Sequence, residues 1–142
     1  MIAIDTNLLV YAHRAAAPEH KKARKAIEQA ALSGGWGFSL PCVSEFYSVV
    51  THAACPPRPS TAQEATGFIE ALYESGAEVW MPGPGFGLRL LKTARTLKVS
   101  GHRIFDLQIA MMAFESGATE LWSHDRNFQT VPGLQIVDPV AH

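Results

Sequence analysis

The amino-terminal stretch Met1-Ile-Ala-Ile-Asp-Thr-Asn-Leu8 is the part of the sequence that indicates the fold most directly. Residues 2–4 form a short apolar run that stops at Asp5, as a buried strand does when it ends at a polar residue. Apolar residues resume after Asn7, so a turn into a helix is expected, with Thr6 or Asn7 near the helix cap. The chain is therefore predicted to begin with a strand, an acid and a helix.

The same alternation continues to the end of the chain. Further strands are expected at residues 36–40, 79–81, 121–125 and 134–137. Helices are expected over residues 18–32, from Pro41 onward, and over residues 61–73, 86–97 and 102–115. Pro41 suits the first turn of a helix, and a capping-box pattern begins at residue 60 or 61. In the last helix Phe105, Ile109 and Met112 fall at helical spacing and are expected to face the core.

Strands that alternate with helices predict an α/β fold with a parallel sheet covered on both faces. A chain of 142 residues fits one domain, residues 1–142. Its 47% hydrophobic and 18% charged residues are typical of a globular protein, and it has no apolar run long enough to span a membrane. The first residues lack the charged start of a signal peptide, so a cytoplasmic location is expected. Cys42 and Cys55 have no metal-type spacing and are expected to be free thiols.

Four acids follow or begin elements in a way that could bring them together. Ligands of parallel α/β sheets bind beyond the carboxyl ends of the strands. Asp5 ends the first strand and Asp125 lies just past the fourth. Glu45 lies about one turn into the helix after the second strand, and Asp106 lies in the first turn of the helix before the fourth strand. All four are predicted at one edge of the sheet.

Each acid also has a purely structural interpretation. Asp5 could cap a helix, Glu45 and Asp106 could be favourable charges near helix N-termini, and Asp125 could form an Asx-turn with Asn127. Taken together, however, four carboxylates at one edge would repel one another unless a cation lies between them. Oxygen ligands of this kind suit Mg²⁺ or Mn²⁺ rather than zinc. Such a site can polarise a phosphate, deprotonate a water and stabilise a leaving oxygen.

At this point the sequence resembles a known family. The motifs that carry the resemblance are Ile4-Asp-Thr-Asn-Leu8, Ser44-Glu45, Asp106-Leu-Gln-Ile-Ala110 and Ser123-His-Asp-Arg-Asn-Phe128. In this order they resemble the successive motifs of PIN-domain nucleases over nearly the whole chain, and most of all the VapC-type ribonuclease toxins of type II toxin–antitoxin systems. The resemblance implies a three-layer α/β/α PIN-like domain with a central parallel sheet. It also implies a Mg²⁺-dependent endoribonuclease, in which Mn²⁺ can substitute, that cleaves RNA with a metal-activated water.

The resemblance also implies a role for each acid. Asp5 and Asp106 are expected to be the direct metal ligands and, with Glu45 and Asp125, the catalytic residues. Glu45 would complete the metal site directly or through water, and Asp125 would support it or help to hold a second ion. Some relatives carry a further acid where this chain has Asn127. Catalysis with one strongly held Mg²⁺ is compatible with this departure.

Supporting groups and partners follow from the same resemblance. The residues expected to orient the carboxylates are Thr6, Asn7 and Ser123. The implied partners are an RNA substrate, a second copy of the chain in a homodimer, and a cognate antitoxin protein that occupies the acidic cleft.

Basic residues are candidates for RNA contacts only where they gather, because the net charge of −1 excludes a general polyanion binder. Lys21, Lys22 and Lys25 are interpreted as a solvated helix face. A second set leads towards Asp106 and is the better candidate for phosphate contacts: Arg89, Lys92, Arg95, Lys98 and Arg103. Arg58, in the proline-rich loop, is another candidate.

The six histidines do not form ligand pairs with helical or finger spacing. His13, His20 and His142 are interpreted as surface residues. His124 adjoins Asp125, but neighbours along a strand point to opposite faces, so a catalytic histidine is not expected.

Other functions remain open at this stage. One alternative is a catalytically silent RNA-binding or regulatory PIN module, although silent members would be expected to lose acids. A PIN nuclease with a non-toxin role, including one directed at DNA, is another. DNA-directed members usually carry insertions for which this chain is too short. A receiver domain would need paired acids early and a lysine late, and this sequence shows neither.

Overall fold

The sheet at the centre of the molecule consists of five parallel strands in a computed structural model that describes residues 1–141. In chain order they are β1 (Ile2–Ile4), β2 (Trp36–Ser39), β3 (Glu78–Trp80), β4 (Glu120–Trp122) and β5 (Gln135–Val137). Across the sheet the order is β3-β2-β1-β4-β5. The chain therefore builds one half of the sheet outward from β1, then returns to the other side of β1 for the second half. This reversal is the topological switch point at which α/β proteins bind ligands.

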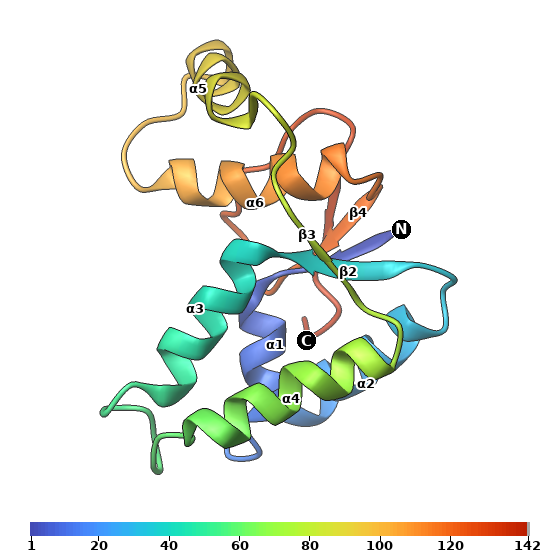
Figure 1. Ribbon diagram of the computed structural model, residues 1–142, viewed down its shortest axis with the longest axis vertical. Helices are drawn as coiled ribbons and strands as arrows, with labels where there is room; N and C mark the ends of the chain where they lie inside the picture. The colour runs from blue at the N-terminus through green and yellow to red at the C-terminus, as the bar shows by residue number, and fades with distance from the viewer. Residues whose placement is uncertain (142) are drawn as a thin grey trace.

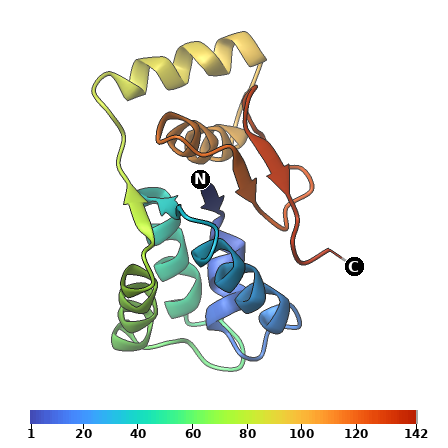
Figure 2. The same ribbon diagram turned by 90° about the vertical axis from the view of Figure 1, so that its right-hand side faces the viewer.

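Six helices cover the two faces of this sheet. They are α1 (Thr6–His13), α2 (His20–Ala31), α3 (Leu40–Thr51), α4 (Ala62–Glu74), α5 (Phe86–Leu97) and α6 (Arg103–Glu115). The first four lie on one side of the sheet, and α5 and α6 lie on the other (Figure 1). Helix α6 lies next to the sheet, and α5 is the outermost element (Figure 2). The predicted three-layer α/β/α arrangement with a parallel sheet is confirmed.

The ends of the helices follow from local sequence, with one correction. Thr61 and Glu64 form the predicted capping box at the start of α4, with hydrogen bonds of 3.0 and 2.9 Å. The residue that caps α1 is Asp5 itself, because its carboxylate accepts the backbone N–H of Thr6. The prediction of Thr6 or Asn7 near the cap was wrong by one position. Asp5 can do this because the chain turns from β1 into α1 without any intervening loop.

The core fills both faces of the sheet. Ile4 and Leu121 are buried on neighbouring strands, and the predicted apolar stripe of α2 is buried at Ala23, Ile27 and Ala30. Gly37 in β2 lies so close to the carbonyl group of Glu78 in β3 that a Cβ atom would overlap it. Cys42 and Cys55 are both free thiols, as expected. Within residues 1–141 there is no helix long and apolar enough to cross a membrane.

Helix α6 contains the second correction. Ile109 and Met112 are buried as predicted, but the side chain of Phe105 is 62% exposed. Phe105 lies in the first turn of α6, and a helix that runs antiparallel to the strands begins beyond their carboxyl ends. The sheet that covers the later turns does not extend over the first one.

Candidate active site

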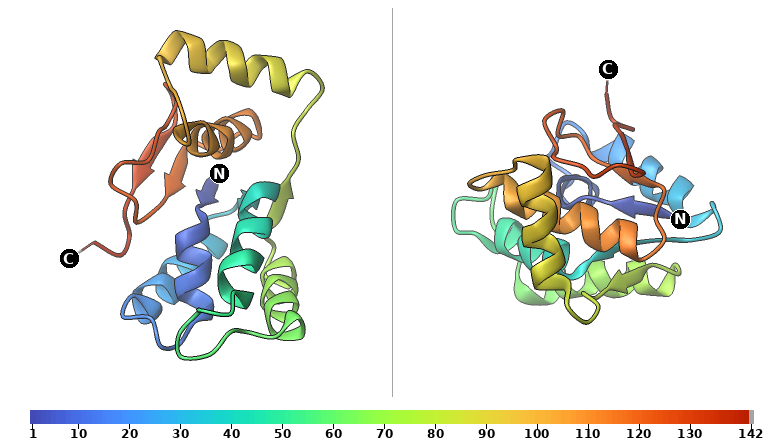
Figure 3. Two further views of the ribbon diagram at one scale, coloured as in Figure 1. Left: turned by 90° about the vertical axis from the view of Figure 1, so that its left-hand side faces the viewer. Right: turned by 90° about the horizontal axis from the view of Figure 1, so that it is seen from above.

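The four acids predicted from the sequence line one cavity of about 330 Å³. Asp5 follows β1, Glu45 lies in α3, Asp106 lies in the first turn of α6 and Asp125 follows β4. Because β1 and β4 are neighbours, the cavity lies at the carboxyl edge of the sheet beside the switch point. Helices α1 and α3 continue side by side from the ends of β1 and β2 (Figure 3). The remaining lining residues are Thr6, Asn7, Val10, Tyr11, Val49 and Ile109.

Asp5 is the most buried of the four acids, with 7% of its surface exposed. One carboxylate oxygen accepts the N–H of Thr6 at 2.7 Å, and the other accepts the hydroxyl of Ser123 at 2.7 Å. Burial raises the pKa of Asp5 to about 6, against the effect of these two hydrogen bonds. The negative charges of Asp106 and Asp125 raise it further. In the absence of a cation, Asp5 therefore holds its proton far more readily than an exposed aspartate does.

Ser123 connects Asp5 to the rest of the site. Its hydroxyl donates to Asp5 and accepts hydrogen bonds from the side-chain amide of Asn7 at 3.3 Å and from the backbone N–H of Asp125 at 3.1 Å. Asn7 in turn accepts the backbone N–H of His124 at 3.3 Å. The predicted supporting residues Asn7 and Ser123 thus join the ends of β1 and β4, while Thr6 contributes its backbone amide.

Glu45 and Asp106 add to the negative charge of the cavity. Partial burial raises the pKa of Glu45, and the charges of Asp5 and Asp106 raise it further. Burial also raises the pKa of Asp106, and the charge of Asp125 adds to this effect. A hydrogen bond from the backbone N–H of Gln129 lowers the pKa of Asp106, and so do the positive charges of Arg103 and His102. The negative charges of Asp5 and Asp106 thus destabilise the ionised form of Glu45.

Asp125 combines the two interpretations that the sequence left open. It lines the cavity, and its charge raises the pKa of both Asp5 and Asp106. Its Oδ1 also accepts the backbone N–H of Asn127 at 2.9 Å, which is the Asx-turn. Asp125 therefore both stabilises a turn and contributes a carboxylate to the cavity.

The donor set matches a hard divalent cation in chemistry, although the side chains do not form a closed site. The cavity supplies carboxylate oxygens, which Mg²⁺ and Mn²⁺ prefer. In the described part of the chain, no three acidic, histidine or cysteine side chains are arranged as a finished metal site. The carboxylates would have to draw together around an ion, and the charge of the ion would offset the repulsion among them.

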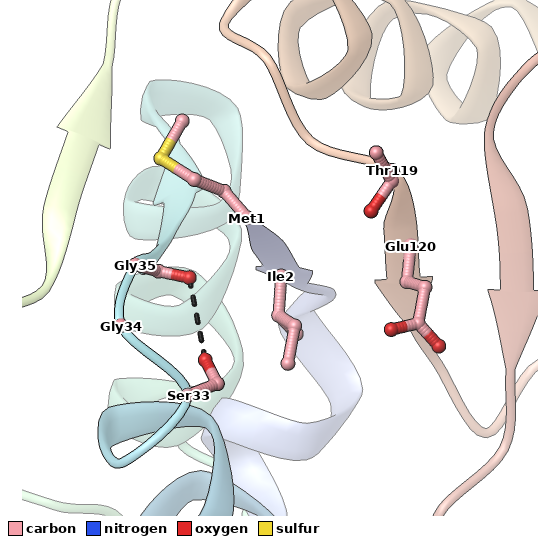
Figure 4. Close-up of a pocket in the computed structure, with 7 residues that line it drawn as sticks. All are labelled: Met1, Ile2, Ser33, Gly34, Gly35, Thr119 and Glu120. Carbon is pink, nitrogen blue, oxygen red and sulfur yellow. Dashed lines mark hydrogen bonds between the residues drawn. The ribbon is translucent and has the colours of Figure 1, made fainter.

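A second cavity, of about 390 Å³, lies at the opposite edge of the sheet (Figure 4). It is lined by residues at the start of β1, the loop before β2 and the start of β4. Of the described residues that line it, Glu120 alone has a charged side chain. This cavity lacks the converging acids, so the carboxyl edge is the better candidate for chemistry.

The histidines differ from the surface residues that were expected. His13 is half-buried and lies 2.9 Å from the hydroxyl of Ser60, and burial lowers its pKa. His20 donates from Nδ1 to the carbonyl oxygen of Tyr11 at 2.8 Å. Both are structural because the loops around them fold back onto α1, which the local sequence does not show. The remaining surface prediction, for His142, lies outside the described residues.

Two of the predicted basic residues form salt bridges. Arg89 forms two hydrogen bonds with Glu115, at 2.9 and 2.8 Å, and Arg58 pairs with Glu64 at 3.2 Å. Lys92 and Arg95 are exposed on α5, Lys98 is exposed at its C-cap, and Arg103 is exposed at the start of α6. Lys21, Lys22 and Lys25 are exposed on α2, as expected. The charge of Arg103 lowers the pKa of Asp106 in the cavity.

Sequence reasoning missed Tyr11 and Asp138. Tyr11 lines the acidic cavity, and Asp138 binds the ring of His124 with an Nδ1–Oδ2 distance of 2.9 Å. Tyr11 could have been found, since it lies four residues after Asn7 and so shares its helix face. Nothing in the local sequence marks Asp138, which follows the last strand and meets His124 only through the pairing of β4 with β5.

Comparisons with known proteins agree with this architecture. The PIN domain family matches residues 2–134. Ribonuclease VapC48 of Mycobacterium tuberculosis is 30% identical over 140 residues, which are 96% of each chain. Ribonuclease VapC43 of the same organism is 33% identical over 130 residues, or 90% of this chain and 88% of the relative.

Solved structures show the same fold. The M. tuberculosis toxin VapC20, described as cleaving the sarcin-ricin loop, superimposes with a TM-score of 0.69 at 12% identity, over 90% of this chain and 92% of that one. Rickettsia felis VapBC2, bound to a DNA fragment from its promoter, gives a TM-score of 0.68 at 18% identity, over 96% and 98%.

Proposed function

The chain belongs to the PIN domain family, and we propose that it is a Mg²⁺-dependent endoribonuclease of the VapC type, the toxin of a toxin–antitoxin pair. The observation that carries the proposal is the convergence of Asp5, Glu45, Asp106 and Asp125 on one cavity at the switch point. Curated relatives that match nearly the whole chain are named ribonucleases. The fold, the PIN domain family and the carboxylate ligands of the cavity therefore all support the hydrolysis of a phosphodiester bond.

The residues of the cavity have distinct parts in this proposal. Asp5 and Asp106 would hold the ion directly, Glu45 would complete its coordination, and Asp125 would support them. When bound, the ion would polarise the phosphate and lower the pKa of a water molecule. Ser123 and the amide of Thr6 keep the Asp5 carboxylate in one orientation, because each donates to a different oxygen. A fixed carboxylate loses less freedom when it binds a ligand than a mobile one does.

The toxin role adds a partner and an assembly to the proposal. A cavity of carboxylates presents a negative field, and a guanidinium can bridge two carboxylates. An antitoxin segment with an arginine would therefore compete with the metal. The solved relative VapBC2 supports a partner of this kind. We also propose that the protein is a cytoplasmic homodimer.

The reaction is tested with purified protein and a long RNA. Asp106→Asn keeps the size of the side chain but removes its charge, so cleavage should fall by orders of magnitude while the melting temperature is kept or rises. Glu74→Gln, at an exposed position on α4, removes a charge away from the cavity and should cleave normally. Cleavage by Asp106→Asn at the normal rate would mean that the site is misassigned, and full activity in excess EDTA would exclude the metal.

The toxin role needs a separate experiment. Expression of the chain alone should arrest growth, and co-expression with the adjacent open reading frame should relieve the arrest and yield a complex. A chain that cleaves RNA in vitro but neither slows growth nor captures the neighbouring product would be a PIN nuclease with another role. RNA binding without any cleavage would favour the silent module.

A further inference from the structure

The carboxylate cavity has an apolar portion that metal binding does not explain. Besides the acids and the polar residues, it is lined by Val10, Tyr11, Val49 and Ile109. A hydrated cation and a phosphate group need charges and hydrogen-bond donors, not hydrocarbon. Among the described residues that line the cavity, Tyr11 is the aromatic one. An aromatic ring beside a phosphate site is the arrangement by which proteins bind unpaired bases.

Tyr11 is anchored through its backbone and has one aromatic neighbour at its ring. Its backbone carbonyl accepts a hydrogen bond from His20. Its ring meets the ring of His124 edge-on, with 6.1 Å between centroids and an interplanar angle of 75°. His124 is held by Asp138 at 2.9 Å. These contacts place the Tyr11 ring beside His124.

The same contacts tie the ring to the carboxylates. The backbone N–H of His124 donates to Asn7, which also donates to Ser123, the residue that holds Asp5. Helix α1 adds a covalent connection, since it begins directly after Asp5 and contains Tyr11. Tyr11 and Asp5 are thus connected both through helix α1 and through His124, Asn7 and Ser123.

We propose that Tyr11 is the stacking surface for an unpaired nucleobase of the RNA, next to the phosphate that the carboxylate cavity receives. This inference rests on the proposed function and adds to it a residue that binds a base of the RNA. A base in a helical stem is already stacked and paired, and would have to leave the stem before it could reach the ring. The phenol is neutral at physiological pH and does not repel the phosphate. Burial and the charges of Glu19 and Asp138 raise its pKa further above the ordinary value of 10.0.

The stacking contact is measured directly with a short single-stranded RNA that contains 2-aminopurine, a base whose fluorescence is quenched when it stacks. The protein carries Asp106→Asn so that the RNA stays intact. At one position of the 2-aminopurine, binding should quench the fluorescence, and Tyr11→Leu should abolish the quenching while Tyr11→Phe keeps it. The fluorescence of 2-aminopurine reports stacking directly, so a small change in the stability of a protein variant does not affect the result. Absence of quenching at every position of the base, with RNA that binds, would overturn the inference.

Binding and kinetics give a second readout. Loss of one stacked base should weaken the binding of single-stranded RNA by about 10- to 100-fold in Tyr11→Leu, and Tyr11→Phe should stay within about twofold of the parent. In the active protein the loss should appear in KM more than in kcat. Tyr73→Leu, at an exposed tyrosine on α4, is the matched control and should change neither. A loss of affinity that is equal for a hairpin stem and a single strand would contradict stacking.

The outcomes separate this inference from the proposed function. If the wild-type protein cleaves RNA and Tyr11→Leu, with an unchanged melting temperature, binds single strands as well as Tyr11→Phe does, then only the stacking role fails. If the wild-type protein neither binds nor cleaves RNA, the proposed function fails and the stacking role with it. If Tyr11→Leu does not fold, the quenching measured with Tyr11 in place still decides the question.

Discussion

The hydroxyl of Ser123 donates a 2.7 Å hydrogen bond to Oδ2 of Asp5, across a sequence separation of 118 residues. The two residues follow neighbouring parallel strands, because Ile4 at the end of β1 pairs with Trp122 at the end of β4. The bond favours the ionised form of Asp5, whereas burial favours the protonated form. The state of the most buried acid in the cavity thus depends on a residue from the far end of the chain.

Replacement of Ser123 with alanine is expected to raise the pKa of Asp5 further and to weaken Mg²⁺ binding. Asn7 and the N–H of Asp125 also lose their acceptor. The free energy of unfolding should therefore fall by about 1–3 kcal/mol. Calorimetric titration with Mg²⁺ and urea unfolding measure the two effects, with Ser44→Ala on the exposed side of α3 as the control. An unchanged Mg²⁺ affinity would show that the hydroxyl does not tune Asp5.

Without divalent ions, ionised Asp5 should destabilise the fold. Its pKa is about 6 in the folded protein against an ordinary value of 3.8, so folding favours the protonated form. The stabilising contribution of protonated Asp5 is complete below the lower value and is lost as the pH rises through the higher one. A difference of this size corresponds to about 2–3 kcal/mol at neutral pH.

Urea unfolding in EDTA over this pH range tests the effect on the wild-type protein and on Asp5→Asn. The wild-type protein should lose stability relative to Asp5→Asn as the pH rises, and Mg²⁺ should reverse the loss. Stability curves that stay parallel over the whole range would contradict the shifted pKa of Asp5.

The exposed cations of α5 are expected to contact RNA phosphates. Lys92→Ala combined with Arg95→Ala should weaken binding by a similar factor for every RNA sequence, and should reduce the slope of log affinity against log salt by about 2. Arg89→Ala should have a smaller effect, because Glu115 already binds its guanidinium group. Fluorescence anisotropy at several salt concentrations measures both quantities. A double variant with the wild-type salt slope would place the RNA elsewhere.

Leu88 and Leu91 share one face of α5 with Lys92 and Arg95, and they are expected to contribute to the proposed homodimer beside the cations that contact RNA. Leu88 is 67% exposed and Leu91 is 61% exposed, one turn apart on the outermost helix. Apolar side chains grouped on a surface commonly mark an interface. Leu88→Glu combined with Leu91→Glu should convert the dimer to a monomer in sedimentation experiments. Leu32→Glu, at a position that is 87% exposed after α2, is the control. A wild-type protein that sediments as a monomer at micromolar concentration would exclude the dimer.

Local patterns in the sequence were sufficient to predict most elements. The strand that ends at Asp5, the capping box of α4 and the helix over residues 86–97 were all predicted, because apolar periodicity, caps and turn residues act within a few positions. The alternation of strands and helices was enough to predict a parallel sheet, since a parallel pair needs a crossover connection. The order of the motifs was enough to predict the family.

Tertiary structure decided what surrounds each side chain. Phe105 has the spacing of a core residue, yet it is exposed because the sheet does not extend over the first turn of α6. The sequence alone predicted that the four acids lie at one edge. Their unequal burial, and with it the raised pKa of Asp5, depends on groups from β1, β4, α3 and α6 that meet only in the folded chain. The place of Tyr11 beside His124 has the same origin, because a contact between distant residues is determined by strand pairing and helix packing.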